Sequence, residues 1–327
     1  MKKAFWVEFI NDRSVLVKED QTILEASLAA GIPHYHACGG KGKCTTCRVL
    51  VNKGEEFLSP YSERELALRT MAPVPPNLRL ACQTYVKGKS VHLHRMIRDE
   101  TDLDIYIRKG TVADLQNAGD EQNLVLFFLD IRNFTPFMES YLPFDVIHVM
   151  RRLFSIFKTS IETYNGKIIE TEGDGFYAVF GFDEELELAS NNAYQAGLTI
   201  LEELEKFNEQ YLEKHFFHSF EVGIGLHAGR VIVGDIGIGV NNNLTAMGMP
   251  VNIASRIQAA TRVLNNSFLI SDDVFKNIYQ AEETRQINIS LKGVKSSITV
   301  HLCGKPYKDV LLRTSADDNI RVTQIEN

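Results

Sequence analysis

Alternating hydrophobic and polar residues predict β-strands in the first hundred residues of the chain. Residues 5–10 alternate and residues 14–18 follow an Asn-Asp turn, so these two segments predict a β-hairpin. Thr22 and Glu25 have the spacing of a capping box, which predicts the start of a short helix. Further strands are expected at 48–52 and 90–94. Together these elements describe a small β-rich module.

Beyond residue 122 the pattern changes to apolar strands and long amphipathic helices. Residues 124–129 form an unbroken apolar run, which predicts a buried strand. Residues 144–164 and 183–214 carry apolar side chains at helical spacing. This mixture of strands and helices predicts an α/β or α+β domain.

A charged, weakly periodic segment lies between the β-rich first part of the chain and the second part with its long helices, and it predicts a linker. A chain of 327 residues is long enough for about two domains. The expected organisation is a first domain at 1–97, a linker at 98–122, a second domain at 123–305 and a tail at 306–327.

Composition and charge narrow the range of partners. The chain is 44% hydrophobic, and 35 Lys and Arg against 42 Asp and Glu give a net charge of −7. This balance argues against nucleic-acid binding and favours small molecules or other proteins as partners. The longest apolar run is too short to span a membrane, and the first residues lack the pattern of a secretory signal. A cytoplasmic location is therefore expected.

Four cysteines have the spacing of an iron–sulfur site. Cys38, Cys44 and Cys47 form a C-x5-C-x2-C run with glycines inside it, and Cys82 follows after 34 intervening residues. Backbone N–H groups of such a loop can donate to the bridging sulfides of a [2Fe-2S] cluster. Residues 1–97 resemble the adrenodoxin-like and bacterial ferredoxins. The resemblance implies a β-grasp-like fold and a [2Fe-2S] cluster held by the four thiolates.

A structural zinc site is the alternative for the same cysteines. Zinc ribbons usually offer two C-x-x-C knuckles, and this chain has one, which favours the cluster. Cys303 has no partner in the pattern and is expected to be a buried core residue. His34, His36, His92 and His94 are interpreted as structural, because four thiolates already fill the coordination.

Two aspartates in the second domain suggest a site for divalent cations. Asp130 ends the apolar strand and precedes a turn, and Asp174 lies between two glycines, as in a hairpin. A carboxylate at a strand end can hold a hard cation against a polyphosphate. Each aspartate taken alone is more typical of an ordinary turn than of a metal site.

Neighbouring segments give the two aspartates a family context. The domain contains, in this order, FLDIRNFT, ETEGDGFYAVF, GIGLHAGRVIVGDIG, GMPVNIASRIQAAT and LKGVKSS. Residues 123–305 thereby resemble the catalytic domain of class III nucleotidyl cyclases. The resemblance implies a ferredoxin-like βαββαβ fold, so the whole chain is expected to be α+β. It also implies a homodimer with active sites at a head-to-tail interface.

The resemblance also implies roles for the residues around the metals. Asp130 and Asp174 would bind two Mg²⁺ or Mn²⁺ ions, with help from the backbone carbonyl of Ile131. Phe134 and Thr135 would offer backbone N–H groups to the phosphates.

Further residues would act on the nucleotide. The resemblance assigns Arg230 and Lys292 to the triphosphate. Asn252 would orient the ribose and base, and Arg256 would stabilise the transition state at the α-phosphate. These two residues are four apart and so project from the same face of a helix. All the catalytic positions are present in one chain, which favours a homodimer with two equivalent sites.

Two positions in this family select the purine base, and here they are Glu170 and Thr245. A carboxylate at Glu170 can accept hydrogen bonds from the N1–H and N2–H₂ edge of guanine, whereas adenine leaves it partly unpaired. Thr245 can donate or accept and does not discriminate. GTP is therefore slightly favoured, and an adenylyl cyclase using ATP is the alternative, with Glu170 an inert strand carboxylate.

The fusion suggests regulation of the cyclase by the cluster. Our hypothesis is that the first domain senses redox state or cluster occupancy, and that a redox partner exists for the cluster. A purely structural cluster is one alternative. Another is an electron-transfer ferredoxin whose second domain only binds nucleotide.

Overall fold

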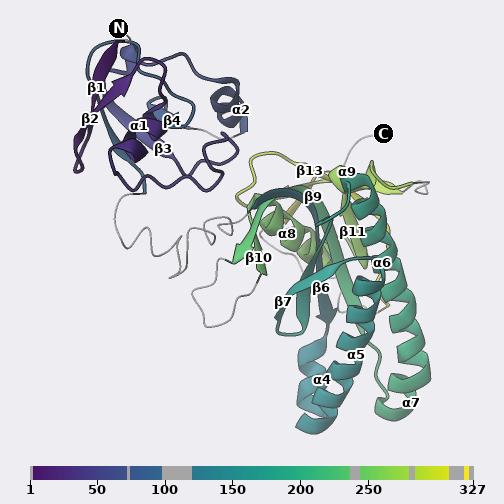
Figure 1. Cartoon of the computed structure of the whole chain (residues 1–327). Coiled ribbons are helices and arrows are strands. Elements are labelled where there is room, and N and C mark those ends of the chain that lie inside the picture. The colour runs from purple at the N-terminus through teal and green to yellow at the C-terminus, as the bar shows by residue number, and fades with distance from the viewer. Residues whose placement is uncertain are drawn as a thin grey trace. The chain divides into compact units, whose positions relative to one another are not determined.

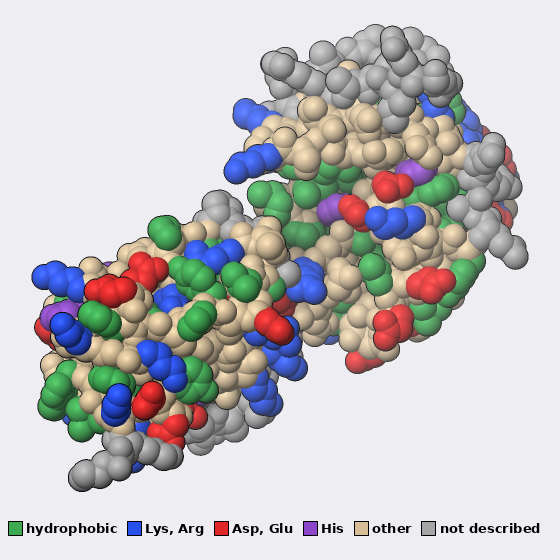
Figure 2. Space-filling model, turned by 90° about the horizontal axis from the view of Figure 1, so that it is seen from above, with side chains coloured by type: hydrophobic (Ala, Val, Ile, Leu, Met, Phe, Trp, Pro, Cys, Tyr) green, Lys and Arg blue, Asp and Glu red, His purple; other side chains and the backbone are tan. Residues whose placement is uncertain are grey.

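The computed structural model describes residues 3–71, 74–97, 120–235, 244–279, 284–308 and 320–323. The chain divides into two compact units, Met1–Gly119 and Asp120–Asn327, called here the N-terminal and C-terminal units (Figure 1). Acidic and basic side chains are interspersed over the face seen in Figure 2. None of the helices in the described ranges combines the length and apolar character that crossing a bilayer would need.

The N-terminal unit is built on a five-stranded sheet with the order β2-β1-β5-β3-β4. Strand β1 runs antiparallel to β2 and parallel to β5, so the hairpin predicted from the alternation is present. The elements of this unit are β1(Ala4–Phe9), β2(Ser14–Lys18), α1(Ile23–Ala29), β3(Arg48–Lys53), the 3-10 turn η1(Glu55–Phe57), α2(Glu63–Met71), β4(Leu78–Leu80) and β5(Val91–Arg95).

Helix α1 begins at the predicted capping box. The Glu25 backbone N–H donates to Thr22 Oγ1 at 3.2 Å, and the Thr22 backbone N–H donates to Glu25 Oε2 at 2.9 Å. These two bonds satisfy N–H groups that have no partner inside the helix. The helix then packs Ile23 and Leu24 into the core of the N-terminal unit.

The described strands of the C-terminal unit form one sheet with the order β14-β12-β13-β11-β9-β6-β8-β7, and β10 pairs with β9. The strands are β6(Asp120–Arg132), β7(Lys167–Glu172), β8(Gly175–Phe180), β9(Glu221–Asp235), β10(Leu244–Met247), β11(Phe268–Ser271), β12(Arg285–Leu291), β13(Ile298–Leu302) and β14(Ile320–Thr323). The helical segments are α4(Phe134–Ser140), α5(Pro143–Thr163), α6(Leu186–Phe207), the π-helical turn η3(Asn208–Leu212), α7(Glu213–Phe216), α8(Met249–Val263) and α9(Asp272–Phe275). The predicted α+β class is confirmed for the chain.

Helices cover both faces of the central strand β6 (Figure 1). Val125, Phe127 and Leu129 point to the face covered by α5 and α6. Leu124 and Leu126 point to the opposite face, where Ala254 of α8 packs. A strand buried on both sides needs apolar residues at every position, which explains the unbroken apolar run in the sequence.

Helix α8 lies against β9 because β9 has glycine at the crossing point. A Cβ atom on Gly225 would lie 2.6 Å from the Cα atom of Gln258, closer than any real side chain allows. The position of α8 matters because this helix carries Asn252 and Arg256.

Two segments differ from the sequence prediction. Residues 120–122, assigned to the linker, are the first residues of β6 and pair with 231–233 of β9. Part of the predicted tail forms β14, which pairs with β12. Both differences arise from pairing with strands far away in the chain, which local composition does not report. The rest of the linker, 98–119, and of the tail, 309–319 and 324–327, lies outside the described residues.

His227 of β9 is a buried histidine that should make the stability of the C-terminal unit depend on pH. Its side chain is 6% exposed, and its Nδ1 atom lies 2.9 Å from Ser271 Oγ. Burial lowers the pKa of His227 from 6.5 to about 4, and the nearby Asp273 opposes the shift only in part. The unfolded chain therefore binds the proton more readily, so His227 costs stability as the pH falls from 6.5 towards 4.

We predict that His227→Asn makes the stability of the C-terminal unit less sensitive to pH in this range. The difference in unfolding free energy between wild type and variant should change by up to about 1.4 kcal/mol per pH unit. Urea unfolding followed by circular dichroism, which reports mainly the long helices, measures it. His148→Asn on the exposed surface of α5 is the control. Parallel curves for wild type and His227→Asn would contradict the prediction.

Candidate cluster site and candidate active site

The four predicted cluster ligands lie near one another in the N-terminal unit. Gly39, Gly40 and Gly42 all have positive φ, at 64°, 80° and 68°, so the loop follows a path that other residues rarely adopt. Backbone N–H groups of this loop reach the Cys38 and Cys82 thiols. The loop therefore supplies the donors expected of a sulfur-rich site.

The thiols are arranged as two pairs. Cys47 Sγ lies 3.4 Å from Cys82 Sγ, and a hydrogen bond joins Cys38 and Cys44. The Cys47 thiol donates to Cys82, which lowers the pKa of Cys82 to about 6 and raises that of Cys47. Among the residues that the structure describes, no three His, Cys, Asp or Glu side chains converge as one metal ion would require. Two pairs of thiols fit two irons better than one zinc.

A buried ion pair holds the chain on either side of Cys82. Arg79 Nε lies 2.9 Å from Glu65 Oε1, and both side chains are 3% exposed. Glu65 also accepts from the backbone N–H of Leu80 and from the Thr84 hydroxyl. Burial alone would raise the pKa of Glu65, but the Arg79 guanidinium and the backbone donors lower it overall. Helix α2 is thereby tied to the segment that presents Cys82.

His34 and His92 contact protein groups outside the four cysteines, and Cys303 packs in the other unit. His34 Nδ1 lies 2.9 Å from Ser27 Oγ and its Nε2 lies 3.2 Å from the Cys47 carbonyl oxygen. His92 pairs with Glu8 at 2.7 Å. Cys303 is half-buried against the core of the C-terminal unit, and burial raises its pKa to about 12. These contacts support the structural interpretation of these residues.

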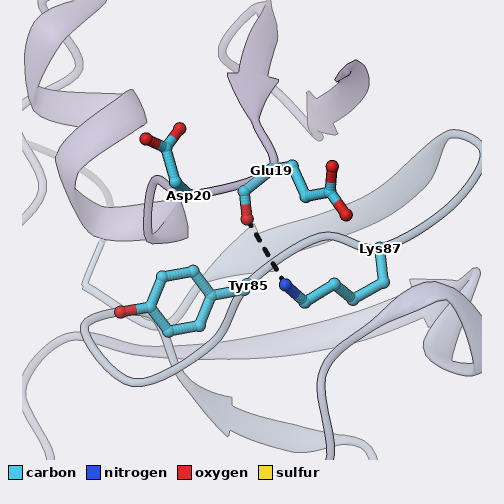
Figure 3. Close-up of a pocket in the computed structure, with 4 residues that line it drawn as sticks. All are labelled: Glu19, Asp20, Tyr85 and Lys87. Atoms are coloured by element: carbon cyan, nitrogen blue, oxygen red, sulfur yellow. Dashed lines mark hydrogen bonds between the residues drawn. The ribbon is translucent and has the colours of Figure 1, made fainter. Parts of the chain in front are cut away.

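A surface pocket of the N-terminal unit contains none of the predicted site residues. It has a volume of about 530 Å³ and is lined by Glu19, Asp20, Tyr85 and Lys87 (Figure 3). Lys87 Nζ donates to the Glu19 carbonyl oxygen at 3.5 Å.

In the C-terminal unit, sheet pairing brings the two predicted metal ligands together. Asp130 lies opposite Gly175, the first residue of β8, and Asp174 immediately precedes it. The Asp130 carboxylate is 35% exposed, and its Oδ2 atom lies 2.8 Å from Arg132 Nη1. Burial raises the pKa of Asp130, the Asp174 charge adds to this, and Arg132 opposes it. Two carboxylates that repel one another can be stabilised by divalent cations.

The other residues of the same motif lie directly beyond Asp130. Ile131 is a buried strand residue, so its backbone is fixed in the sheet. Phe134 and Thr135 begin α4, where backbone N–H groups have no acceptor within the helix. Asn133 precedes them with φ of 55°, a conformation that Asn tolerates better than most residues.

Tyr177 contacts the two predicted base-selecting regions, and the sequence pattern alone did not single it out. Glu170 pairs with Tyr177 across β7 and β8 at a β-bulge, and Tyr177 stacks on Phe128 with ring centroids 5.1 Å apart. Burial and the Glu170 charge raise the pKa of Tyr177, while a backbone hydrogen bond from Ala246 opposes the shift. Ala246 follows Thr245 on β10, so the Tyr177 hydroxyl lies beside the backbone of that strand and near the Glu170 charge. The alternation along β8 was the available signal for Tyr177.

The residues predicted to bind phosphates and to stabilise the transition state lie in separate places. The Arg256 guanidinium lies beside Gly293, since a Cβ there would be 3.6 Å from Arg256 Nη1, and Lys292 precedes this glycine. Asn252 is exposed near the start of α8. Arg230 lies on β9 seven residues beyond Gly223, which pairs with Asp130. At roughly 3.3 Å per residue, Arg230 is about 23 Å along the sheet from Asp130.

Comparison with known proteins identifies the family. Residues 117–304 match the family described as adenylate and guanylate cyclase catalytic domain. Because this match covers more than half of the chain, the protein belongs to this family. Residues 9–87 match the 2Fe-2S iron-sulfur cluster binding domain. The two predicted resemblances are therefore confirmed.

The curated relatives are longer proteins. The chain is 29% identical over 185 residues to adenylate cyclase 1 of Rhizobium meliloti, covering 56% of this chain and 28% of that protein. It is 26% identical over 191 residues to an adenylate cyclase of Anabaena cylindrica, covering 56% of this chain and 37% of that protein. The chain thus spans about a third or less of the length of these relatives.

Solved structures share the fold of the C-terminal unit. The adenylyl cyclase CyaB from P. aeruginosa matches with a TM-score of 0.53 at 21% identity, over 58% of this chain and 98% of that one. The guanylyl cyclase Cya2 matches with a TM-score of 0.52 at 24% identity, over 59% of this chain and 96% of that one.

Proposed function

We propose that the protein is a class III cyclase that converts a purine nucleoside triphosphate to its 3′,5′-cyclic monophosphate and pyrophosphate. The observation that carries the proposal is the meeting of Asp130 and Asp174 at adjacent strand ends in a chain of the cyclase family. Asn252 and Arg256 on one face of α8 complete the residues that such chemistry needs.

The residues present fit a pair of divalent cations. Asp130, Asp174 and the backbone carbonyl of Ile131 would hold two Mg²⁺ or Mn²⁺ ions, because carboxylate and carbonyl oxygens suit these cations. When bound, the ions would activate the ribose 3′-hydroxyl and neutralise the leaving pyrophosphate. The backbone N–H groups of Phe134 and Thr135 would bind phosphate oxygens.

The remaining cations would stabilise the charge that builds up on the phosphates. Arg256, beside Gly293, is the residue proposed to stabilise the pentavalent α-phosphate, and Arg230 and Lys292 would bind the triphosphate. Asn252 would hold the ribose and base in the orientation for in-line attack.

We propose that a homodimer assembles the active sites. The separation between Asp130 and Arg230, about 23 Å along the sheet, favours sites that take residues from two protomers. Exposed apolar side chains lie near Arg230 and Thr245, and they are Ile232, Met247 and Met249. Such a patch suits an interface between two copies of the chain, with each site taking residues from both.

GTP is the slightly favoured substrate, and ATP is the alternative. The Glu170 carboxylate can accept from the guanine edge, and Tyr177 beside it adds a hydroxyl group to the same environment. The adenylyl alternative is supported by the relatives from Rhizobium meliloti and Anabaena cylindrica, which are named adenylate cyclases.

We further propose that the N-terminal unit holds a [2Fe-2S] cluster and regulates the cyclase. The two pairs of cysteine thiols and the backbone N–H groups around them support the cluster. Free thiols of this kind suit a reducing cytoplasm, where a redox partner could change the state of the cluster. A cluster that only stabilises the fold, or one that serves electron transfer, is the alternative.

The substrate is tested by incubating the purified chain with ATP, GTP, CTP and UTP plus Mn²⁺ and identifying cyclic products by mass. We predict a preference for GTP, and a shift of the GTP to ATP ratio of kcat/KM by about ten- to a hundredfold towards ATP in Glu170→Lys. Glu162→Lys on the surface of α5 is the control. A wild type that makes only the adenine product would refute the interpretation of Glu170, and no cyclic product would refute the cyclase proposal.

We propose that each composite site takes Asp130 from one protomer and Arg256 from its partner, which predicts complementation between two inactive variants. Asp130→Asn and Arg256→Ala should each lose at least about a hundredfold of the activity. Co-expressed in equal amounts, they should recover about a quarter of it, because half of the dimers are mixed and each mixed dimer has one intact site.

The matched control is co-expression of Asp130→Asn with Asp174→Asn, which damage the same half of each site and should not recover. Cyclic product is measured for each mixture. Equal failure of both mixtures, with folded dimers present, would contradict a composite site.

Regulation predicts that cyclase rates depend on the state of the cluster. Anaerobic protein with the cluster oxidised and reduced should differ by about fivefold or more, a typical coupling between sites. Cys44→Ser should lose iron and sulfide and no longer respond to reductant, whereas Cys303→Ser should behave as wild type. Iron and sulfide content and product formation are measured together. Identical rates in oxidised, reduced and cluster-free protein would rule out regulation.

A further inference from the structure

A buried arginine beside the predicted metal site is bound on every side of its guanidinium group. Arg132 is 4% exposed, and its Nη1 atom lies 2.8 Å from Asp130 Oδ2. Its Nε donates to the Tyr307 hydroxyl at 3.3 Å, and its Nη2 donates to the Gln258 carbonyl at 3.3 Å and to Thr261 Oγ1. Asp130 lies on β6, as Arg132 does, Gln258 and Thr261 lie on α8, and Tyr307 lies in the segment after β13. The guanidinium is therefore held in one orientation by three parts of the fold.

The neighbouring strand leaves room for this group. Gly223 of β9 lies opposite Asp130, and a Cβ atom there would overlap both Arg132 Nη2 and Thr261 Oγ1. The absence of a side chain at this position lets the guanidinium enter between β9 and α8. The site is thus built around the arginine, because a larger residue at 223 would displace it.

The ion pair also determines which way the Asp130 carboxylate faces. Oδ2 binds Arg132, whereas Oδ1 lies on the side of Gly175, where a Cβ would be 3.6 Å away from it. Gly175 directly follows Asp174, so Oδ1 is the oxygen on the side of the second carboxylate. A carboxylate held by one oxygen keeps lone pairs free on the other for a cation.

We propose that Arg132 is a positioning residue for the metal site, which fixes the Asp130 carboxylate so that Oδ1 is presented beside Asp174. This inference rests on the proposed cyclase function and adds a residue to it. The Gln258 side chain also donates a hydrogen bond to Asp130. Without the guanidinium, this neutral contact would hold the Asp130 carboxylate without an ion pair, and the cation would lose a ligand fixed by the charge of Arg132.

The test measures binding of Mn²⁺ to the full chain by the electron paramagnetic resonance signal of the free ion. Arg132→Met should weaken Mn²⁺ binding by about tenfold or more, the range typical of groups that orient a ligand. Arg132→Lys keeps the charge but not the planar fork, and it should fall between wild type and Arg132→Met. Arg152→Met, which removes an arginine stacked on Tyr211 at 4.1 Å, should bind Mn²⁺ as wild type does.

Tyr307→Phe is a second variant whose Mn²⁺ binding tests the role of Arg132. It removes one partner of Arg132 and leaves the contact with Asp130 in place, so it should weaken Mn²⁺ binding by a few-fold. If Arg132→Met does not fold, Tyr307→Phe and Arg132→Lys decide the question. Thermal unfolding of each variant identifies folded protein.

Unchanged or tighter Mn²⁺ binding in folded Arg132→Met would overturn the inference, because the arginine would then be structural or a competitor of the cation. If Arg132→Met does not fold, unchanged binding in Tyr307→Phe and Arg132→Lys would overturn it as well. The cyclase proposal is judged separately, by product formation in wild type and by loss of Mn²⁺ binding in Asp174→Asn. An active wild type with normal binding in Arg132→Met would leave the proposed function standing and reject only the role of Arg132.

Discussion

The long antiparallel pairing of β6 with β9 is the constraint on which the C-terminal unit depends. It extends from Asp120 opposite Val233 to Arg132 opposite Glu221, in the centre of the sheet. Because both faces of β6 are covered by helices, the register cannot slip without exposing apolar side chains. The same pairing places Arg230 seven residues along β9 from Gly223, the residue opposite Asp130.

Each unit pairs a buried arginine with a carboxylate near its candidate site. In the N-terminal unit, Arg79 and Glu65 tie α2 to the segment that carries Cys82. In the C-terminal unit, Arg132 joins Asp130 to α8 and to Tyr307. Pairs of this kind contribute little net stability, since desolvation offsets the attraction. Their value here is positional, because each fixes the orientation of groups next to chemically active residues.

Much of the local structure followed from short-range patterns. The predicted helix at 144–164 corresponds to α5(Pro143–Thr163), and the capping box at Thr22 is present as expected. The cysteine spacing and the order of the cyclase motifs were enough to identify both families. These features depend on residues close together in the chain, where helical period, capping and loop geometry act directly.

The sequence by itself determined the two families, the helices and the residue types at each candidate site. Only the tertiary structure brought Asp174 beside Asp130 and joined Arg132 to Tyr307, which is 175 residues away in the chain. It also showed that residues 120–122 and part of the tail belong to the sheet. These contacts depend on strand register and on the packing of α8 against β9. Neither of them can be deduced from local periodicity, because the partners are distant in the chain.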